Sequence, residues 1–402
     1  MAGIVVVGAG QAGAALVAKL RALGHDGSVT LIGAEPVPPY QRPPLTKKYL
    51  TGEMALERLF LRPESFYADQ NITLRLGCRV TGVDPAARVV RLGDETLPYD
   101  QLALTTGAVP RRLPAAIGGD LAGVYVARDL ADADAMMPEF APGRRLLVVG
   151  GGYIGLEAAA VAASRGLAVT LVEAAPRILG RVASAETADW FRALHTGYGV
   201  QVIEGAGLER LTGTQGRVTG ARLTDGREIA ADFVIAGIGI APDTALAEAA
   251  GLALDNGIAV DAQGRTSDPR VWAAGDCASF PHAGGRLRLE SVQNAIDMAE
   301  AVAANMLGAG RDYAPVPWFW SDQYDVKLQI AGLNTGHDRV VTRPGKGEAV
   351  SFWYFRGPRF LAVDAANDPR AYMIGKRLLE AGRSPDPDAL ADPATDLKAL
   401  LA

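Results

Sequence analysis

The sequence contains only two cysteines among its 402 residues, Cys78 and Cys277, and they are far apart. This small number excludes a disulfide framework, and their separation excludes a C-x-x-C redox pair. An iron–sulfur cluster usually needs four thiolates, so we expect this chain to bind none. The four histidines show no metal-ligand spacing. Because cysteines without partners are typical of a reducing compartment, we predict a cytoplasmic protein.

Long hydrophobic runs and an excess of positive charge are also missing. No run approaches the roughly 20 apolar residues of a membrane span. The uncharged stretch 1–18 lacks the preceding Lys or Arg of a signal peptide and is interrupted by glycines. The chain has 40 Lys and Arg against 45 Asp and Glu, for a net charge of −5, which argues against nucleic acid as the main partner. We therefore expect a soluble protein that binds neither nucleic acid nor a membrane.

Glycine, in contrast, is abundant, with 47 residues, and three of them mark a turn near the start of the chain. The apolar run at 4–7 is typical of a buried parallel strand. Residues 14–23 are predicted to form a helix and residues 29–32 a second strand. Before the helix stand three glycines in G-x-G-x-x-G order, here called the first glycine turn: Gly8, Gly10 and Gly13. This order of elements predicts a dinucleotide-binding site.

Each residue of this pattern has a physical role in binding a dinucleotide. Gly8 makes the tight turn, Gly10 lets the backbone approach a pyrophosphate, and Gly13 lets helix and strand pack closely. The free N–H groups and partial positive charge of the helix N-terminus attract the phosphates. Glu35 follows the second strand, 22 residues after Gly13, where an acid accepts hydrogen bonds from a ribose diol.

A stiff loop follows Glu35. Five prolines between Pro36 and Pro44 hold it extended and remove backbone donors. Its cations are Arg42 and Lys47. One interpretation is that they bind the neighbouring phosphates, and the alternative is that they are solvated surface charges.

The opening pattern returns in the middle of the chain. A strand at 146–149 precedes a second glycine turn and a helix at 156–164, and Glu173 lies 18 residues after the last glycine. Residues 232–239 match residues 100–107 in spacing and apolar character. The second glycine turn consists of Gly150, Gly152 and Gly155. Two similar halves predict two dinucleotide domains, the architecture of electron transfer between a flavin and a nicotinamide.

The last third of the chain contains a further flavin-binding candidate and a different domain. Asp276 ends a predicted strand, where it is placed to bind the ribityl hydroxyls of a flavin, and a helix from 290 to 307 is placed to direct its N-terminus at the flavin pyrimidine. The aromatic run 318–320 is either core or cofactor contact. A helix capped by Asp368 follows three predicted strands, which together indicate a small α+β domain. These strands are 326–330, 349–355 and 360–363.

Several motifs occur together with the two glycine turns. They are Pro39-Tyr40-x-Arg42-Pro43-Pro44-Leu45-x-Lys47, Thr106-Gly107-x-x-Pro110-Arg111, Gly275-Asp276 and Trp318-Phe319-Trp320-Ser321-Asp322-Gln323-Tyr324. With them the chain resembles, over nearly its whole length, the FAD-dependent NADH:ferredoxin reductases of bacterial haem-thiolate monooxygenases and aromatic-ring dioxygenases. The resemblance implies an α/β fold of the glutathione-reductase type, with two Rossmann-like dinucleotide-binding domains and a small C-terminal α+β domain. The implied boundaries are 1–110 and 241–314 for the FAD domain, 111–240 for the NAD domain and 315–402 for the C-terminal domain.

The resemblance also implies which residues bind each cofactor. In such enzymes the lysine matching Lys47 lies near flavin N5 and pairs with the glutamate matching Glu157, which makes these two residues the expected catalytic pair. Val80 and Arg128 rest on the resemblance alone. The implied FAD ligands are Gly8, Gly10, Gly13, Glu35, Arg42, Lys47, Val80, Arg128, Asp276 and Val292. The implied NADH ligands are Gly152, Tyr153, Ile154, Gly155, Glu157, Glu173, Arg181 and Gly239, and Gly107 and Gly150 complete the cofactor-binding set.

The scarcity of cysteine separates this chain from disulfide reductases of the same fold, which need two cysteines beside the flavin. The loop after Glu35 also lacks the single thiol of NADH peroxidases. The implied route is one electron at a time to an acidic 2Fe–2S ferredoxin and, through it, to an oxygenase. The alternatives are a rubredoxin or monodehydroascorbate as acceptor, and an apoptosis-inducing-factor-like flavoprotein with a scaffold or signalling role. That last class is expected to carry a targeting segment before its first glycine turn.

Two further expectations concern nucleotide selectivity and docking. Glu173 stands where a ribose 2′-OH is recognised and predicts NADH over NADPH, whereas Arg177 or Arg181 would accommodate a 2′-phosphate. Because the net charge is negative, an acidic ferredoxin requires a local basic patch. Lys327 alternates with apolar residues close to Trp320 and is the first candidate. Trp320 then lies either between flavin and cluster or in the core.

Overall fold

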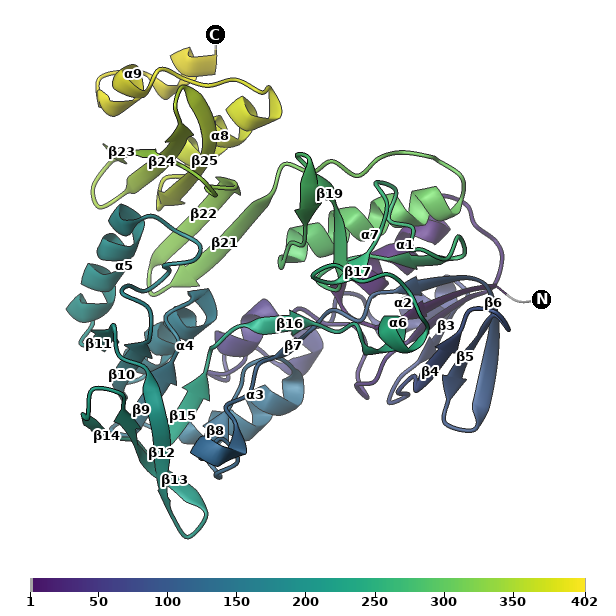
Figure 1. Cartoon of the computed structure of the whole chain (residues 1–402), viewed down its shortest axis with the longest axis horizontal. Coiled ribbons are helices and arrows are strands. Elements are labelled where there is room, and N and C mark those ends of the chain that lie inside the picture. Colours follow the sequence, from purple (N-terminus) through teal and green to yellow (C-terminus); the bar gives the residue numbers. More distant parts are fainter. Residues whose placement is uncertain (1–2, 402) are drawn as a thin grey trace. The chain divides into compact units, whose positions relative to one another are not determined.

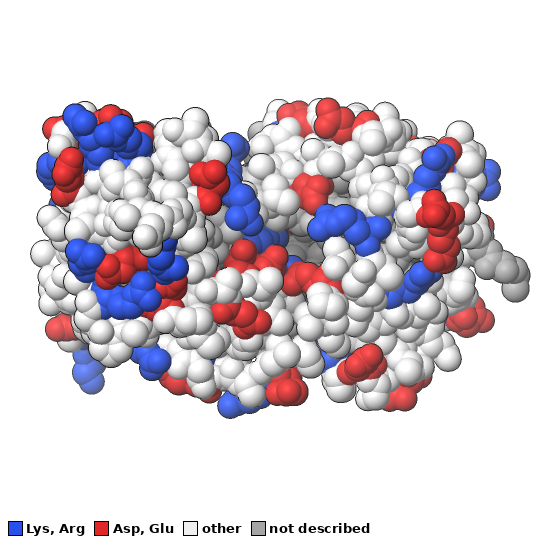
Figure 2. Space-filling view, turned by 90° about the horizontal axis from the view of Figure 1, so that it is seen from below, with Lys and Arg blue, Asp and Glu red and all other residues white. Residues whose placement is uncertain are grey.

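The computed structural model describes residues 3–401 and divides into two compact units (Figure 1). Unit 1 contains residues 3–41, 56–109 and 240–315, and unit 2 contains residues 42–55, 110–239 and 316–401. No helix within 3–401 combines the length and the apolar character that crossing a membrane requires. On the face drawn in Figure 2, acidic and basic side chains are interspersed.

Unit 1 is organised around a seven-stranded sheet in the order β3-β2-β1-β6-β5-β4, with β18 also paired to β6. The pairs β1–β2, β1–β6, β2–β3 and β18–β6 are parallel, so these strands end at the same edge of the sheet. The strands are β1 (Gly3–Val7), β2 (Val29–Ile32), β3 (Ile72–Arg75), β4 (Gly82–Asp84), β5 (Val89–Leu92), β6 (Glu95–Leu104) and β18 (Val271–Ala273).

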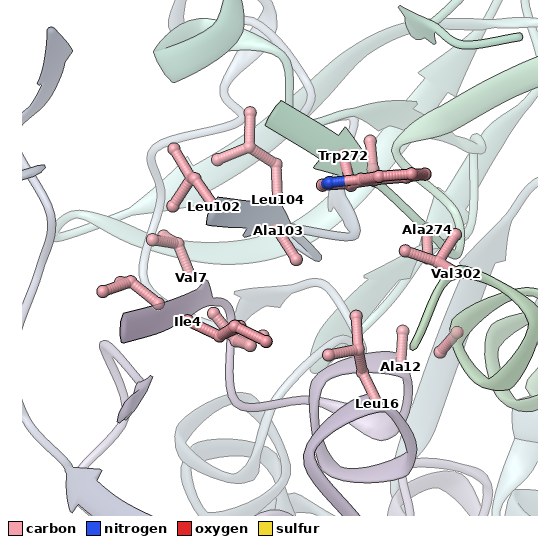
Figure 3. Packing of buried hydrophobic residues seen from close by; sticks show 14 of the residues in the cluster. Ile4, Val7, Ala12, Leu16, Leu102, Ala103, Leu104, Trp272, Ala274 and Val302 are labelled. Carbon is pink, nitrogen blue, oxygen red and sulfur yellow. The ribbon is translucent and has the colours of Figure 1, made fainter. Parts of the chain in front are cut away.

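Helices α1 and α7 lie side by side against this sheet. Leu16 of α1 and Val302 of α7 belong to one buried cluster with Ile4, Leu102 and Trp272 (Figure 3). This core fixes the starts of both helices near the carboxyl ends of the parallel strands. The remaining elements of unit 1, with β7 reaching one residue beyond it, are α1 (Gln11–Ala22), η2 (Leu56–Arg58), α2 (Glu64–Asp69), β7 (Ala108–Pro110), β16 (Ile240–Pro242), α6 (Ala245–Ala249), β17 (Ile258–Ala259), β19 (Ala278–His282), β20 (Gly285–Leu287) and α7 (Val292–Met306).

Unit 2 contains a second parallel sheet, in the order β11-β10-β9-β15-β8. Leu147, Val148 and Ile235 are fully buried, as expected for strands covered on both faces. The elements of this part are η1 (Pro43–Thr46), η3 (Ala115–Ile117), β8 (Val124–Tyr125), α3 (Leu130–Met136), η4 (Met137–Glu139), β9 (Arg145–Val149), α4 (Tyr153–Ser164), β10 (Ala168–Glu173), α5 (Ala185–Gly197), β11 (Gln201–Glu204) and β15 (Phe233–Ala236).

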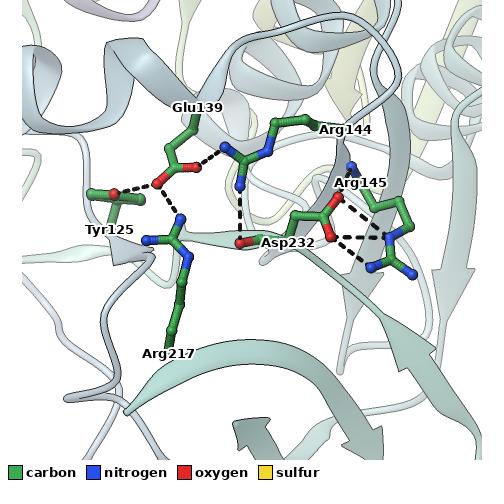
Figure 4. Close-up of polar contacts among 6 residues, drawn as sticks. All are labelled: Tyr125, Glu139, Arg144, Arg145, Arg217 and Asp232. Carbon is green, nitrogen blue, oxygen red and sulfur yellow. Dashed lines mark hydrogen bonds and ion pairs between the residues drawn. The ribbon is translucent and has the colours of Figure 1, made fainter. Parts of the chain in front are cut away.

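A buried carboxylate connects this sheet to an antiparallel one, β12-β13-β14 (Figure 4). Glu139 is 5% exposed and accepts a hydrogen bond of 2.8 Å from the Tyr125 hydroxyl. It forms ion pairs of 2.5 Å with both Arg144 and Arg217, the latter from β13. Two cations compensate the burial of one carboxylate, so we assign this cluster a structural role. The three strands are β12 (Leu208–Thr214), β13 (Arg217–Leu223) and β14 (Glu228–Ala230).

The C-terminal part of unit 2 is a five-stranded antiparallel sheet in the order β21-β22-β25-β24-β23. Leu328 and Phe352 of this sheet share a hydrophobic cluster with Leu146 and Leu156 of the parallel-sheet part. The Asp368 side chain caps α8, as predicted. The elements are β21 (Trp318–Gln323), β22 (Val326–Gly332), β23 (Arg339–Pro344), β24 (Val350–Arg356), β25 (Arg359–Ala366), α8 (Pro369–Glu380), α9 (Pro387–Ala391) and η5 (Leu397–Leu401).

The predicted fold class, two Rossmann-like parts and a small α+β part, is confirmed, with differences at element ends. Helix α1 begins at Gln11 and not at residue 14, and α4 at Tyr153 and not at residue 156. The last glycine of each turn therefore lies within the first helical turn. The aromatic run 318–320 is part of strand β21, which the sequence pattern did not predict because three successive bulky residues show no alternation.

Candidate functional site

The first glycine turn lies where β1 ends and α1 begins. Gly8 has a φ of 113°, and a Cβ there would lie 2.2 Å from the Thr105 carbonyl oxygen, so only glycine fits. A Cβ on Gly13 would lie 2.0 Å from the Gly8 carbonyl oxygen, which measures how closely helix and strand approach. Apart from Gly10 itself and its chain neighbours, no heavy atom of residues 3–401 lies within 4 Å of the Cβ position of Gly10. This position leaves room for a ligand beside the backbone.

The N-terminus of α1 is open to an anion. Its N-cap is Gly10, no side chain caps it, and its first turn has no acidic residue. Helices α5, α7 and α8 instead have the N-caps Ser184, Ser291 and Asp368, whose side chains accept hydrogen bonds from backbone N–H groups. Uncapped N–H groups at the start of a helix are the donors that bind pyrophosphate in dinucleotide folds. The described residues of unit 1 therefore fit the pyrophosphate of FAD.

Three predicted FAD ligands lie near this helix start or at the same edge of the sheet. A Cβ on Gly275 would lie 3.0 Å from the Ala12 Cβ in α1 and 3.8 Å from Ala295 in α7, which places Asp276 beside both helices. Val292 is the first residue of α7. Glu35 follows β2, and its Oε2 accepts a hydrogen bond of 2.5 Å from the Tyr40 hydroxyl.

Val80, which spacing alone did not identify, belongs to unit 1, as does Gly107. Val80 is 8% exposed and lies in the main core cluster, two residues after Cys78, whose N–H donates to the Gly33 carbonyl at 2.9 Å. This bond brings the Val80 segment to the end of β2. Gly107 has a φ of 72°, and its carbonyl accepts from the Asp243 N–H at 2.9 Å.

The second glycine turn repeats the geometry of the first in unit 2. Gly150 has a φ of 106°, and a Cβ there would lie 2.4 Å from the Gly237 carbonyl oxygen. A Cβ on Gly155 would lie 2.1 Å from the Gly150 carbonyl oxygen, whereas the Cβ position of Gly152 is open. Gly152 is also the N-cap of α4, with no side-chain cap and no acid in the first turn. Unit 2 thus has a second site that fits a pyrophosphate.

The acid of the second site is held beside its glycine turn. Glu173 accepts hydrogen bonds of 2.7 Å from the N–H of Gly151 and from the N–H of Ala175. A carboxylate has about four lone-pair directions, so acceptor capacity remains for a ribose. The Cβ position of Gly239 lies 3.7 Å from Arg181 Nη2, which brings these two predicted ligands together.

One aromatic and one aliphatic residue, Tyr153 and Ile154, follow Gly152 of the second glycine turn at the start of α4. Ile154 is 46% exposed, so its side chain is accessible to a nucleotide at the second glycine turn. Tyr153 points inward, and its buried hydroxyl has no hydrogen-bond partner among the described residues. Its ring packs against Phe319 with a centroid distance of 5.0 Å. Tyr153 thus lies between the second glycine turn and β21.

Lys47 and Glu157 form an ion pair. Lys47 Nζ lies 3.0 Å from Glu157 Oε1, and the two side chains are 17% and 5% exposed. Glu157 projects from the first turns of α4, and Lys47 follows the 3-10 helix η1. Burial raises the pKa of the Glu157 carboxyl above its usual range, and the Lys47 charge opposes part of that rise. The arrangement positions a cation on a side chain that is otherwise flexible.

The loop that carries Lys47 is anchored within unit 2. Arg42 donates to the Arg128 carbonyl at 2.8 Å, and the Tyr49 hydroxyl donates to Asp134 at 2.7 Å. Leu50 is 1% exposed and belongs to the same hydrophobic cluster as the parallel sheet of this unit. The structure therefore brings Arg42, Lys47, Arg128 and Glu157 into one unit, and the glycine turn with Glu35 and Asp276 into the other.

Sequence reasoning missed the other partners of Glu157. Ser321 Oγ donates to Glu157 Oε1 at 2.8 Å, and the Thr46 hydroxyl lies 3.4 Å from Oε2. Thr46 directly precedes Lys47, so its position in the loop was the one available signal. Ser321 lies in the aromatic motif quoted above, but its orientation is set by the strand β21, which was not predicted.

Two glycine turns, two uncapped helix starts and, with each turn, an acid at or after the end of the second strand fit a protein that binds two dinucleotides. With the buried lysine–glutamate pair beside the second turn, the fold and site are those of a pyridine-nucleotide-dependent flavoprotein oxidoreductase.

Comparison with known proteins places the chain more closely. Residues 2–299 match the family model for pyridine nucleotide-disulphide oxidoreductases, and residues 318–401 match the model for the reductase C-terminal domain. The chain is 44% identical to a ferredoxin–NAD(P)+ reductase of Sphingomonas sp, covering 98% of this chain and 96% of the relative. It is 40% identical to the ferredoxin–NAD+ reductase component of the anthranilate 1,2-dioxygenase system of Burkholderia cepacia, covering 99% and 98%.

A solved structure agrees with these relatives. The covalent complex of putidaredoxin reductase with putidaredoxin contains a chain that superimposes with a TM-score of 0.95 at 38% identity, covering 100% of this chain and 98% of that one. The chain therefore belongs to the pyridine nucleotide-disulphide oxidoreductases and, within them, to the ferredoxin–NAD(P)+ reductases. It is an oxidoreductase that uses FAD and a pyridine nucleotide.

Proposed function

We propose that this protein is an NADH-dependent FAD flavoprotein that passes electrons one at a time to a 2Fe–2S ferredoxin serving a haem-thiolate monooxygenase or a ring-hydroxylating oxygenase. The observation that carries the proposal is the buried Lys47–Glu157 pair beside the second glycine turn. The names of the relatives, which mention a ferredoxin and a dioxygenase system, support it. When bound, FAD supplies the conversion of a two-electron donor into single-electron transfers.

The two cysteines support an exit of electrons without thiol chemistry. Both are free, and neither lies in the loop after Glu35. Burial raises the pKa of the Cys277 thiol, which keeps it protonated and unreactive. Cys78 donates to the Leu76 carbonyl at 3.3 Å. Two unpaired thiols also support the further proposal that the protein is cytoplasmic.

The assignment of ligands follows from the same proposal. We assign the FAD and NADH ligands as named above from the resemblance, with the catalytic pair Lys47 and Glu157, and we keep the domain boundaries given there. In this assignment the first glycine turn, Glu35 and Asp276 hold FAD. The second glycine turn, Glu173, Arg181 and Gly239 hold NADH.

We expect NADH to be preferred over NADPH by about 10²-fold in kcat/KM, because a like charge beside a phosphate costs several kcal/mol. Glu173 carries that charge and is held against the turn by Gly151 and Ala175. Arg177 is an unsuitable phosphate ligand, since it donates to the carbonyls of Ala183 and Ser184 at 2.8 and 3.0 Å.

Steady-state kinetics with both nucleotides measure this preference. Glu173→Gln keeps an acceptor for the Gly151 N–H but removes the charge, so it should narrow the ratio of kcat/KM values by at least about tenfold. Glu186→Gln, on an exposed turn of α5, is the matched control and should leave the ratio unchanged. Equal use of NADH and NADPH by the unaltered protein would contradict the assignment of Glu173.

The function is tested by the turnover of the FAD-loaded protein with NADH and a 2Fe–2S ferredoxin. Lys327 is exposed, and it stands opposite Asp322 in the β21–β22 pair, on the face that also carries Trp320. We propose that this face belongs to the docking surface. Exposed charges act mainly on the encounter and are screened by salt. Ferredoxin reduction should therefore fall as ionic strength rises, while reduction of a small neutral acceptor barely changes.

Charge reversal locates the surface. Lys327→Glu should slow ferredoxin reduction about threefold to tenfold at low salt, and Lys398→Glu, an exposed lysine on η5, is the matched control. If the protein reduces rubredoxin or monodehydroascorbate efficiently but does not reduce ferredoxin, ferredoxin is not the acceptor. Slow NADH oxidation with all acceptors would favour a scaffold or signalling role. Ferredoxin turnover that is independent of salt would make Trp318 and Trp320 the residues to test.

A further inference from the structure

A continuous series of hydrogen-bonded, buried side chains leads from Glu157 to His195, and we call it the hydrogen-bonded series. Ser321 Oγ lies 2.8 Å from Glu157 Oε1, and Gln323 Nε2 lies 3.2 Å from Ser321 Oγ. His195 Nε2 lies 2.7 Å from Gln323 Oε1, and the Tyr324 hydroxyl lies 3.1 Å from His195 Nδ1. Glu157, Ser321, Gln323 and His195 are each at most 4% exposed. Nothing in the proposed electron transfer accounts for these partners of Glu157.

The Glu157 carboxylate determines the direction of every hydrogen bond in this series. An ionised Glu157 only accepts, so the Ser321 hydroxyl donates to it and must itself accept from the Gln323 amide nitrogen. The Gln323 oxygen then faces His195, which fixes the imidazole as the tautomer protonated on Nε2. His195 Nδ1 is left as an acceptor for the Tyr324 hydroxyl. Each hydrogen bond therefore donates toward Glu157.

The fold holds both ends of this hydrogen-bonded series in place. Ser321 and Gln323 are alternate residues of β21 and share one face of the strand, toward α4 and α5. Tyr324, at a φ of 56°, turns the chain from β21 into β22. Its ring stacks on Tyr198, at the end of α5, with a centroid distance of 3.7 Å and an interplanar angle of 6°. The C-terminal sheet thus contacts the nucleotide-binding part of unit 2 through polar groups as well as apolar ones.

We infer that Ser321, Gln323 and His195 are positioning residues that keep the Glu157 carboxylate ionised and directed at Lys47. This inference rests on the proposed role of the Lys47–Glu157 pair. A buried carboxylate tends to take up a proton, and donors aimed at its ionised form oppose this. Among the described residues, four groups face Glu157: Lys47, Thr46 and Ser321 favour its charge, and Asp322 disfavours it.

Ser321 donates to Glu157 only while Gln323 and His195 keep their hydrogen bonds in the same direction. Without the His195 N–H, the buried Gln323 oxygen would lack its donor, and the amide could turn to present its oxygen to Ser321. The Ser321 hydroxyl would then donate to Gln323 and not to Glu157. His195 therefore acts on Glu157 through two intervening side chains.

The first test is the pH profile of flavin reduction by NADH in the FAD-loaded full chain. A hydrogen bond to a charged group contributes about 1.5–3 kcal/mol, so Ser321→Ala should move the acid limb upward by about one to two pH units. Asp322→Asn should move the same limb downward, because it removes a neighbouring negative charge. His195→Leu should shift the limb as Ser321→Ala does. His195→Gln, whose amide N–H replaces the imidazole Nε2–H, should restore the wild-type profile.

The second test needs no turnover. With only four histidines in the chain, the imidazole nitrogens can be assigned by NMR. His195 should be the Nε2-protonated tautomer and should stay neutral through the range in which exposed histidines titrate, since burial lowers its pKa. Tyr324→Phe removes the donor to Nδ1 and should shift that nitrogen while the Glu157 pair remains intact.

The outcomes separate this inference from the proposed function. An Nδ1-protonated His195, or an unchanged pH profile in Ser321→Ala, would overturn the donor chain even if NADH and ferredoxin react as proposed. Failure of the wild-type protein to reduce ferredoxin would overturn the proposed function. The His195 tautomer would still show in which direction the hydrogen-bonded series runs.

Discussion

We expect Lys47→Ala to lower the rate of flavin reduction by NADH by about 10²- to 10³-fold, because in the proposed function Lys47 supplies a preorganised charge at the reacting centre. Lys47 is held by Glu157 at 3.0 Å and is largely buried, so its charge acts in a medium of low dielectric constant. The variant should still contain FAD, because the first glycine turn, Glu35 and Asp276 belong to unit 1 and are unchanged. Stopped-flow absorbance of the flavin measures the rate, and the absorbance of the purified protein measures FAD content.

Three further variants separate chemistry from folding. Lys48→Ala alters the adjacent, exposed lysine and should leave the rate unchanged. Lys47→Arg keeps a cation and should retain more activity than Lys47→Ala. Because the pair acts as a unit, Lys47→Ala with Glu157→Gln should be slowed by much less than the product of the single effects. An unchanged rate in Lys47→Ala would reduce Lys47 to a structural loop cation.

The parts of the fold that could be predicted from sequence are those whose cause is local. Gly8 and Gly150 need positive φ, and Gly13 and Gly155 need the absence of a Cβ within the same strand–turn–helix segment. Such requirements leave a pattern of fixed spacing that can be read without a structure. The capping of α8 by Asp368 is another local effect of this kind.

The parts that could not be predicted depend on contacts between distant segments. Lys47 and Glu157 are separated by 110 positions, and only the resemblance to a family suggested that they pair. Ser321, on β21, donates to the Glu157 carboxylate, and His195, on α5, contacts Gln323 of the same strand. No sequence periodicity connects β21 with α5. The carboxylate of Glu139, with its two arginines, is a similar case.

A third buried carboxylate, Asp364 on β25, is expected to make the stability of the protein depend on pH. Its Oδ2 accepts hydrogen bonds from the Tyr354 hydroxyl and, at 3.2 Å, from the Thr187 hydroxyl. Its Oδ1 is buried without a partner among the described residues. Burial raises the pKa of Asp364 from 3.8 to about 7, against the opposing effect of the two donors.

The sign of the effect follows from this raised pKa. Below 3.8 the carboxyl is protonated in both the folded and the unfolded chain. As the pH rises, the unfolded chain releases the proton first, and the folded chain keeps it until about 7. The free energy of unfolding therefore falls between these two values and levels off above them, by about 4 kcal/mol in all at about 1.4 kcal/mol per unit.

Asp364→Asn removes this titration and should be more stable than the wild type at about pH 8, by an amount that is about 3 kcal/mol larger than at about pH 5. Thermal unfolding at the two pH values measures the difference. Subtracting wild type from variant cancels the opposite contribution of His195, whose lowered pKa destabilises the folded chain at acid pH. Asp312→Asn, at an exposed aspartate, is the matched control and should show no such trend. A difference between Asp364→Asn and wild type that stays constant with pH would mean that Asp364 is ionised throughout, and that the buried site tolerates its charge.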